Sequence, residues 1–131
     1  DDSFRNLRID IFVKEQGVPE ENEFDDYDMQ VPHLVIFSDG EAVATGRVIP
    51  YGEDTVKIGR IAVKKDKRGL HLGEKIVLEL LRKSKEDGAK TVRVGAQTHA
   101  VGFYEKCGFK LLGTPEYMEE NIPHYDMILD F

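Results

Sequence analysis

Hydrophobic residues near the start of the chain recur at helical spacing. Phe4, Leu7, Ile11 and Phe12 share one face of a helix that we predict over about residues 3–14. A chain that begins inside a helix leads us to expect a further strand ahead of residue 1, missing from these 131 residues.

The periodicity then fades from residue 15 to residue 32. Gly17, Pro19 and Pro32 bracket an acidic segment, which we predict to be a loop with one helical turn. Long irregular segments inside compact domains are often binding elements, so this one is a candidate for ligand contact.

Apolar and alternating runs predict three successive strands. The runs at 33–38 and 41–49 flank Asp39-Gly40, a dipeptide typical of a tight hairpin turn. After a break at 50–54, the run at 55–63 alternates and predicts the third strand.

Helices and strands alternate in the rest of the chain. Leu72, Ile76 and Leu80 keep an i, i+4 register in a helix predicted to end near Asp87, with Gly88 as its stop. The other predicted elements are strands at 91–94, 109–112 and 125–131 and a short helix at 98–106. This order predicts a single α/β (α+β) domain over residues 1–131, with helices packed on a mixed sheet.

Composition narrows the class of protein. With 40% hydrophobic residues and only short apolar runs, the chain reads as a soluble globular protein with no membrane partner. No secretory signal is visible and Cys107 has no cysteine to pair with, so we expect a cytoplasmic location. A net charge of −7 argues against nucleic acid as a partner. An exposed final strand at 125–131 could pair across a homodimer.

A basic loop precedes the helix that begins at Leu72. A strand, a loop with two glycines and a helix start can present several backbone N–H groups to one anion. The loop lacks the Ser or Thr of a nucleotide-hydrolase phosphate loop, and only Gly69 and Gly73 are present where a dinucleotide fingerprint needs three glycines. The four histidines are scattered, so no metal site is expected.

The loop from Arg68 to Gly73 resembles the [QR]-x-x-G-x-[GA] pattern of the GNAT superfamily of acyl-CoA-dependent N-acetyltransferases, with His71 at the first glycine of that pattern. A second segment also resembles the family, because a polar amide is followed by Ala, Tyr, Lys and Gly-Phe at the family's spacing. Those positions are Gln97, Ala100, Tyr104, Lys106, Gly108 and Phe109.

A third segment resembles a bacterial branch of small, single-domain GNAT proteins of largely unassigned substrate. It runs from Arg8 to Pro19, and an Ile-Pro-His sequence at 122–124 belongs to the same pattern. Arg8 and Phe12 with Glu23, Asp26 and Asp28 are also similar to acyl-homoserine-lactone synthases, but the tryptophan of those synthases is absent.

The resemblance implies a mixed, mostly antiparallel sheet that splays between strands 55–63 and 91–94, with the pantetheine arm of acetyl-CoA in the gap. It implies acetyl transfer to a primary amine of a small molecule or peptide by direct attack in a ternary complex, without a metal. The alternatives are a non-catalytic acyl-CoA-binding module and, third, acyl-lactone synthesis. The implied cofactor contacts are Ile61, Ala62, Val63, Arg68, Gly69, Leu70, His71, Leu72, Gly73, Gln97, Phe103, Tyr104 and Lys106.

Amine acylation needs a proton donor for the leaving thiolate and a base for the amine. Tyr104 suits the first role because the unperturbed phenol keeps its proton at neutral pH. For the base, Glu15, His33 and His124 are left as alternatives, since each lies at an element edge that the resemblance places near the substrate.

Overall fold

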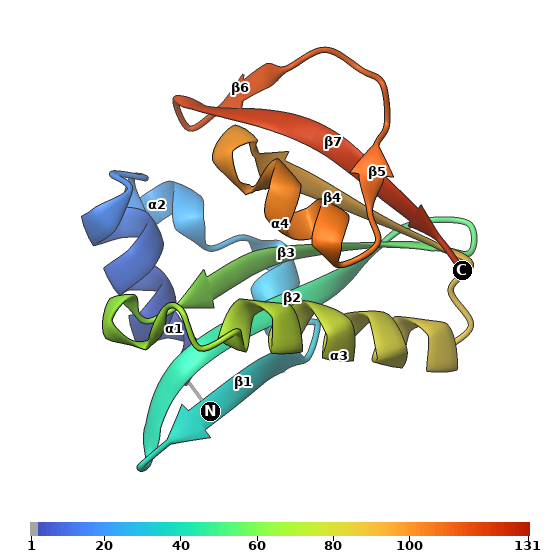
Figure 1. Ribbon diagram of the computed structural model, residues 1–131. Helices are drawn as coiled ribbons and strands as arrows, with labels where there is room; N and C mark the ends of the chain where they lie inside the picture. The colour runs from blue at the N-terminus through green and yellow to red at the C-terminus, as the bar shows by residue number, and fades with distance from the viewer. Residues whose placement is uncertain (1–2) are drawn as a thin grey trace.

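A seven-stranded mixed sheet forms the centre of the computed structural model, which describes residues 3–131 (Figure 1). Its spatial order is β1-β2-β3-β4-β7-β5, and β6 pairs with β7. Only β3 and β4 run parallel, so the prediction of a mixed, mostly antiparallel sheet is confirmed. The strands are β1 (His33–Ser38), β2 (Glu41–Gly52), β3 (Thr55–Val63), β4 (Thr91–Gln97), β5 (Lys110–Leu111), β6 (Tyr117–Glu119) and β7 (Ile122–Asp130).

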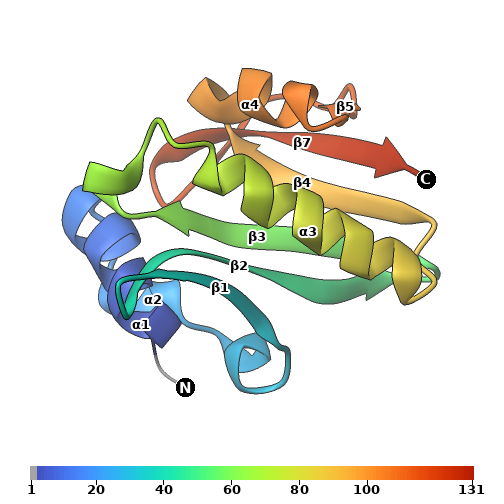
Figure 2. The ribbon, with the colours of Figure 1, turned by 60° about the horizontal axis from the view of Figure 1, so that its bottom comes forward.

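Helices lie on both faces of this sheet. Figure 2 shows α3 lying along one face, with α4 above it and with α1 and α2 at one end of β1 to β3. The longer helical elements are α1 (Ser3–Arg8), the π-helix η1 (Ile9–Glu15), α2 (Glu20–Glu23), α3 (Leu72–Glu86) and α4 (Val101–Lys106). The 3-10 turns are η2 (Asp26–Met29), η3 (Lys65–Lys67) and η4 (Thr98–Ala100).

The predicted first helix is present but changes type partway. It starts as α1 and continues as η1, whose wider turns are common at functional sites. The predicted loop after it contains α2 and η2, one helical segment more than expected. Asp25 accepts a hydrogen bond from the Tyr27 backbone N–H, and the Asp28 carboxylate accepts one from the Asp25 N–H, so this acidic segment caps its own turn.

The main core lies between α3 and the sheet. Ile76 and Val77 on α3 are fully buried, as are Ile58 and Val92 on the strands below. At Gly46 on β2, an added Cβ would lie 2.7 Å from the Ile76 side chain, so α3 packs directly on bare strand backbone there.

The Asp39-Gly40 hairpin turn is confirmed. Both residues have positive φ, 52° and 79°, as a tight two-residue turn requires. The strand after it continues to Gly52, past the predicted break at 50–54.

The predicted splay between the parallel strands is also confirmed. β3 and β4 are paired only from Thr55–Thr91 to Ile58–Val94. Beyond that point Ala62 pairs with β2 alone. The β4-facing edge of β3 is therefore free of strand pairing over its last residues, as Figure 1 shows where the two strands diverge.

The C-terminal region departs from the prediction. The expected connection at 113–123 contains β6, and β7 starts at Ile122. β7 pairs with β4 on one side and with β5 and β6 on the other. The final strand is therefore interior, and the prediction that it offers a free edge to a homodimer is wrong. The predicted strand at 109–112 is shorter, Lys110–Leu111.

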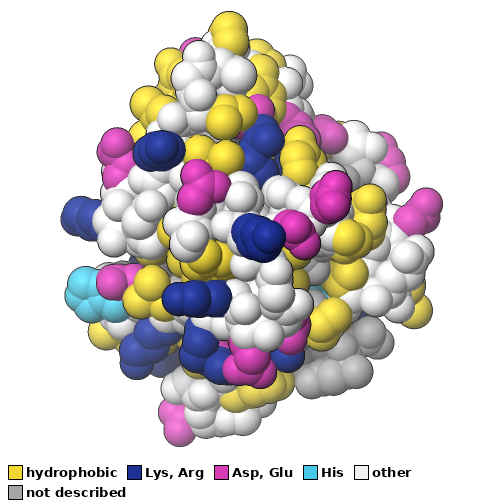
Figure 3. Space-filling model, turned by 90° about the vertical axis from the view of Figure 1, so that its right-hand side faces the viewer, with side chains coloured by type: hydrophobic (Ala, Val, Ile, Leu, Met, Phe, Trp, Pro, Cys, Tyr) yellow, Lys and Arg dark blue, Asp and Glu magenta, His cyan; other side chains and the backbone are white. Residues whose placement is uncertain are grey.

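Charges of both signs cover the surface. On the face shown in Figure 3, Lys and Arg side chains are interspersed with Asp and Glu, and hydrophobic side chains lie between them. Among residues 3–131, no helix is long and apolar enough to cross a membrane.

Candidate active site

A cleft of about 660 Å³ lies where β3 and β4 separate. This volume is within the range of about 300–1,000 Å³ that is usual for small-molecule sites. Its walls come from η1, α2, η2, β3, β4, the α3 start, α4 and the β6–β7 turn. Predicted site residues that line it are Glu15, Ile61, Ala62, Val63, Arg68, Gly73, Gln97, Phe103, Tyr104 and His124.

Unpaired backbone donors gather at the start of α3. Between Gly69 and Glu74, no backbone N–H donates to another backbone group of residues 3–131. α3 has 15 residues and no side-chain cap, so the positive end of its dipole is open to solvent. These donors can bind an anion such as a phosphate.

His71 adopts the backbone conformation that favours glycine. It is the N-cap of α3, with φ 60° and ψ 24°. Histidine is among the non-glycine residues found more often in this left-handed region. The loop therefore turns as a glycine would allow, and the His71 side chain, 80% exposed, points away from the core.

Gly73 brings two predicted segments together. An added Cβ there would lie 3.4 Å from the Phe103 ring and 3.5 Å from the Val63 side chain. The α3 start, α4 and the end of β3 are thus in contact around one point. The other predicted cofactor contacts are not among the residues that line the cleft: Gly69, Leu70, His71, Leu72 and Lys106.

Two sequence-predicted site residues, Glu15 and Arg68, form an ion pair. Both Arg68 terminal nitrogens donate to the Glu15 carboxylate, at 2.8 and 3.0 Å, and Arg68 Nε donates to the Val63 carbonyl at 3.2 Å. The hydrogen bonds from Arg68 lower the pKa of Glu15. A carboxylate held in this way is a weaker base, so the contact weakens the case for Glu15 as the base.

An amide pair crosses the splay. Gln97 at the end of β4 donates to the Gln16 side-chain oxygen at 2.8 Å. Gln16 follows η1, so this contact ties the first helix to the strand on the far side of the gap.

Tyr104 lies in the wall of the cleft with 7% of its surface exposed. Its ring makes edge contacts with Phe103 and Phe109. Burial raises the pKa of Tyr104 above its ordinary value, so the phenol is protonated at neutral pH. Its hydroxyl has no hydrogen-bond partner within the described residues, which leaves it available to a ligand.

The His124 ring has a fixed orientation. Its Nδ1 lies 2.7 Å from the Ile122 carbonyl oxygen, which can only accept, so Nδ1 donates. In the neutral ring Nε2 is then the acceptor. Nε2 lies 3.8 Å from the Glu119 carboxylate. The ring also stacks on Tyr117.

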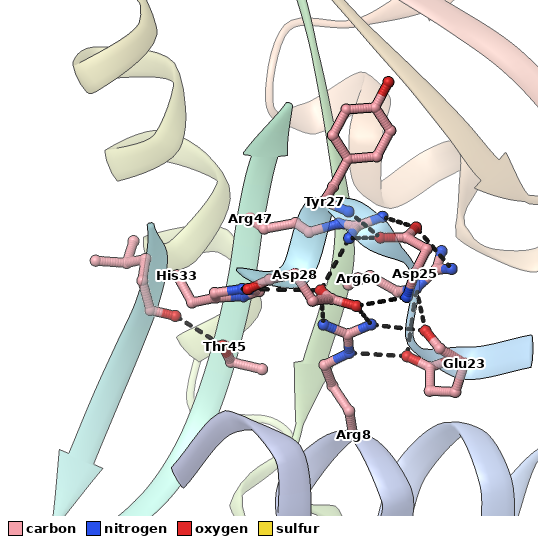
Figure 4. A network of polar contacts seen from close by, with 10 residues as sticks. Arg8, Glu23, Asp25, Tyr27, Asp28, His33, Thr45, Arg47 and Arg60 are labelled. Carbon is pink, nitrogen blue, oxygen red and sulfur yellow. Dashed lines mark hydrogen bonds and ion pairs between the residues drawn. The ribbon is translucent and has the colours of Figure 1, made fainter. Parts of the chain in front are cut away.

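His33 lies outside the cleft and belongs to a buried polar network (Figure 4). Its Nε2 donates to the Asp28 carbonyl at 3.1 Å, and its ring stacks on Phe4 at 3.8 Å. Burial lowers the pKa of His33, so the ring is neutral at neutral pH. Its remaining nitrogen is buried without a partner among the described residues. The structure thus places His33 in the buried network and outside the cleft.

Three arginines and three carboxylates make up the charged part of this network. Arg8 is fully buried and donates to Glu23 at 2.8 Å and to Asp28 at 2.6 Å. Arg47 binds Asp25 through both terminal nitrogens, at 2.7 Å each. Figure 4 shows these groups converging from α1, β2 and the acidic segment, with Arg60 beside Glu23. The network fixes the acidic segment as one wall of the cleft.

Because of Asp28, the free energy of unfolding should fall as the pH is lowered into the acid range. Burial alone would raise its pKa, but hydrogen bonds from Arg8 and from the Asp25 backbone lower it to about 2, from an ordinary 3.8. The stabilisation is present above about pH 4 and is lost as pH falls towards 2, amounting to about 2–2.5 kcal/mol. Urea unfolding between pH 2 and 6 checks this slope. Asp28→Asn should remove this part of it, and an unchanged slope in that variant would contradict the assignment.

Sequence reasoning did not find several residues that line the cleft. Asp25 reaches it from the N-cap of η2, Tyr27 from η2, and Lys57 and Gly59 from β3. The one signal in the sequence for these residues was Lys57, a charged residue in the alternating pattern of a predicted strand. Within residues 3–131, no three His, Cys, Asp or Glu side chains are placed to hold a metal ion.

Comparison with known proteins identifies the family. An acyl-CoA N-acyltransferase structure from Pseudomonas aeruginosa superposes with a TM-score of 0.86 at 31% identity, covering 97% of this chain and 87% of that chain. A Bacillus subtilis acetyltransferase in complex with CoA gives a TM-score of 0.77 at 22% identity, covering 100% and 93%, and shows the shared fold alone. The fold is thus that of an acyltransferase.

The chain belongs to the GNAT acetyltransferase family. The family described as "Acetyltransferase (GNAT) domain" matches residues 7–131. Among curated relatives, the uncharacterized N-acetyltransferase YjcF of Bacillus subtilis (strain 168) is 35% identical over 127 residues, covering 95% of this chain and 88% of the relative.

Proposed function

We propose that this protein transfers an acetyl group from acetyl-CoA to a primary amine by direct attack within a ternary complex. The observation that carries the proposal is the cleft at the strand splay, whose lining includes Gly73 at the open start of α3 and the oriented imidazole of His124. The backbone donors can bind the CoA pyrophosphate, and the imidazole can accept a proton from an amine.

The pantetheine arm would lie in the gap between β3 and β4. The edge of β3 that faces β4 has no strand partner beyond Ile58, so its backbone can pair with the amides of the arm as with an added strand. Ile61, Ala62 and Val63 line the cleft along this edge. This route places the thioester near the point where the strands part.

His124 is the base in this proposal. Its Nε2 is the acceptor of the neutral ring, and His124 lines the cleft together with Gln97, its partner in the β4–β7 ladder. The neutral amine attacks the thioester carbon, and a C–N bond forms as the C–S bond breaks. His124 takes the proton that the amine loses, and the thiolate leaves as the thiol with a proton from Tyr104. Solvent then exchanges protons with both side chains.

Arg68 is proposed to bind a CoA phosphate, which requires it to exchange Glu15 for the phosphate. The pair is on the surface, with side chains 41% and 35% exposed, so this exchange costs little. Arg68→Ala should weaken acetyl-CoA binding by about 1–3 kcal/mol, because a charge-assisted contact is lost. Isothermal titration calorimetry with acetyl-CoA measures the change.

Glu15→Gln is the matched variant for that experiment. It frees Arg68 and removes a negative charge beside the phosphate site, so affinity should stay the same or rise. Equal losses of affinity in both variants would mean that the ion pair itself supports the loop, and the phosphate contact would be refuted.

The function is tested with acetyl-CoA and a panel of primary amines, following the free thiol. Thiol release that depends on an amine supports the enzyme. Tight acetyl-CoA binding without turnover on any amine would favour a non-catalytic acyl-CoA-binding module. Thiol release that requires S-adenosylmethionine in place of a simple amine would favour acyl-lactone synthesis.

A further inference from the structure

Two cations from neighbouring strands lie side by side where β3 and β4 are still paired, and one of them, Lys57, lines the cleft. Lys57 on β3 and Arg93 on β4 are Cα partners in the parallel ladder. Side chains at paired positions stand on the same face, here the face opposite α3. Like charges directly opposite each other are destabilising, so a nearby anion would be favourable.

Arg93 has partial compensation. Its terminal nitrogen lies 3.7 Å from the Asp126 carboxylate, and its guanidinium lies over the Tyr51 ring at 5.2 Å. The other Asp126 oxygen accepts a hydrogen bond from Tyr117. The Asp126 carboxylate therefore already interacts with both Arg93 and Tyr117.

Lys57 shares the contact with the Tyr51 ring but not the contact with a carboxylate. Its ammonium lies 5.5 Å from the centre of the Tyr51 ring and forms no ion pair within the described residues. The other cations that line the cleft, Arg47, Arg60 and Arg68, all pair with carboxylates. Lys57 is thus the unpaired cation of this cleft among residues 3–131.

The ammonium of Lys57 lies at the splay itself. It is 4.0 Å from the point that a Cβ on Gly95 would occupy. Gly95 follows Val94, the last β4 residue paired with β3. The lysine thus reaches diagonally across to β4, next to the proposed position of the thioester.

Open space lies beside it over Gly59. An added Cβ on Gly59 would meet nothing within 4 Å, although Gly59 lines the cleft. Its φ is outside the left-handed region, so an L-residue fits the backbone. The floor between Lys57 and the splay is therefore bare strand backbone, which leaves room for a small molecule.

We propose that this space is the acceptor subsite and that Lys57 binds a carboxylate of the acceptor. The proposal rests on the acyl transfer proposed above and adds the class of acceptor, a small amino acid with its carboxylate a few bonds from the reacting amine. Glu119 and Glu120 line the cleft at the β6–β7 turn, where His124 lies, and suit the cationic end of such a molecule. Carboxylate and ammonium then lie against groups of opposite charge.

The test compares γ-aminobutyrate with 4-amino-1-butanol, which has the same chain and a hydroxyl in place of the carboxylate. Binding of each is titrated by NMR, with and without CoA. The amino acid should bind at least about tenfold more tightly than the amino alcohol, because a charge-assisted contact is added. Lys57→Gln should remove the difference. Lys110→Gln, at an exposed lysine on β5, should retain it.

Gly59→Val provides a second, steric test. It should weaken binding of both compounds at least about tenfold while urea unfolding and CoA binding stay unchanged. Equal binding of the two compounds to the wild type, or an undiminished preference in Lys57→Gln, would overturn the carboxylate subsite. Failure of the wild type to bind acetyl-CoA or to turn over would instead count against the proposed function. The comparison of the two compounds in the absence of CoA requires neither acetyl-CoA binding nor turnover, so it tests the carboxylate subsite separately.

Discussion

His124→Asn is expected to lower kcat by about 10²–10³-fold at saturating acetyl-CoA, since a positioned general base contributes about 10²–10⁴-fold. Asparagine retains an N–H close to the place of Nδ1, which can still donate to the Ile122 carbonyl. The variant therefore removes the acceptor nitrogen while the local fold is kept. Steady-state thiol release with a saturating amine measures kcat.

The affinity for CoA separates this loss from misfolding. His124→Asn should bind CoA as the wild type does, because His124 belongs to β7 and not to the loop before α3 that is proposed to bind the pyrophosphate. Lys110→Gln is the control, at an exposed lysine on β5 that does not line the cleft, and should keep kcat. If His124→Asn retained kcat within about twofold, His124 would not be the base.

Arg8→Met is expected to destabilise the protein by about 3–5 kcal/mol. The guanidinium is fully buried and holds the Glu23 and Asp28 carboxylates, whose side chains are 3% and 2% exposed. Removing one partner leaves buried charge without full compensation, which costs far more than a surface ion pair contributes. Urea unfolding at pH 7 measures the free energy of unfolding.

Arg82→Met is the control for that measurement. Arg82 pairs with Glu79 and Glu86 on the exposed face of α3, and its side chain is 57% exposed. This change should lower the free energy of unfolding far less than Arg8→Met does, because exposed ion pairs contribute little. If Arg8→Met were no more destabilising than Arg82→Met, the buried network would not be what fixes the acidic segment.

Short sequence patterns were enough to predict the elements whose ends are determined by one or two residues. Asp39-Gly40 is a turn because both residues accept positive φ, and α3 follows the i, i+4 apolar register. The splay between β3 and β4 was expected from the family resemblance, which extends over nearly the whole chain.

The β6–β7 hairpin could not be predicted from such signals. Its turn uses Glu120 and Asn121 at φ 51° and 61°, so a glutamate takes a conformation for which it gives no sequence signal. β6 has only three residues, Tyr117–Glu119, too few for an alternating pattern to be recognised. Because the pairing of β6 with β7 was not predicted, β7 was expected at the edge of the sheet and not inside it.

The site was predictable only where it is made by contiguous residues. The loop before α3 can be recognised from its sequence, whereas the buried network joins Arg8 to Asp28 and Arg47 across three elements. The predicted acidic set named Asp26, but Asp25 is the residue that binds Arg47, while Asp26 is exposed. Such pairs depend on the angles at which elements pack.

The most direct measurement of acyl transfer counts both products in one reaction, CoA thiol by colorimetry and N-acetylated amine by mass spectrometry. Equal amounts are expected, formed only when a primary amine is present and reduced together about 10²–10³-fold in His124→Asn. Thiol release without N-acetylated product, or acetyl-CoA binding with neither product on any amine, would contradict an N-acetyltransferase.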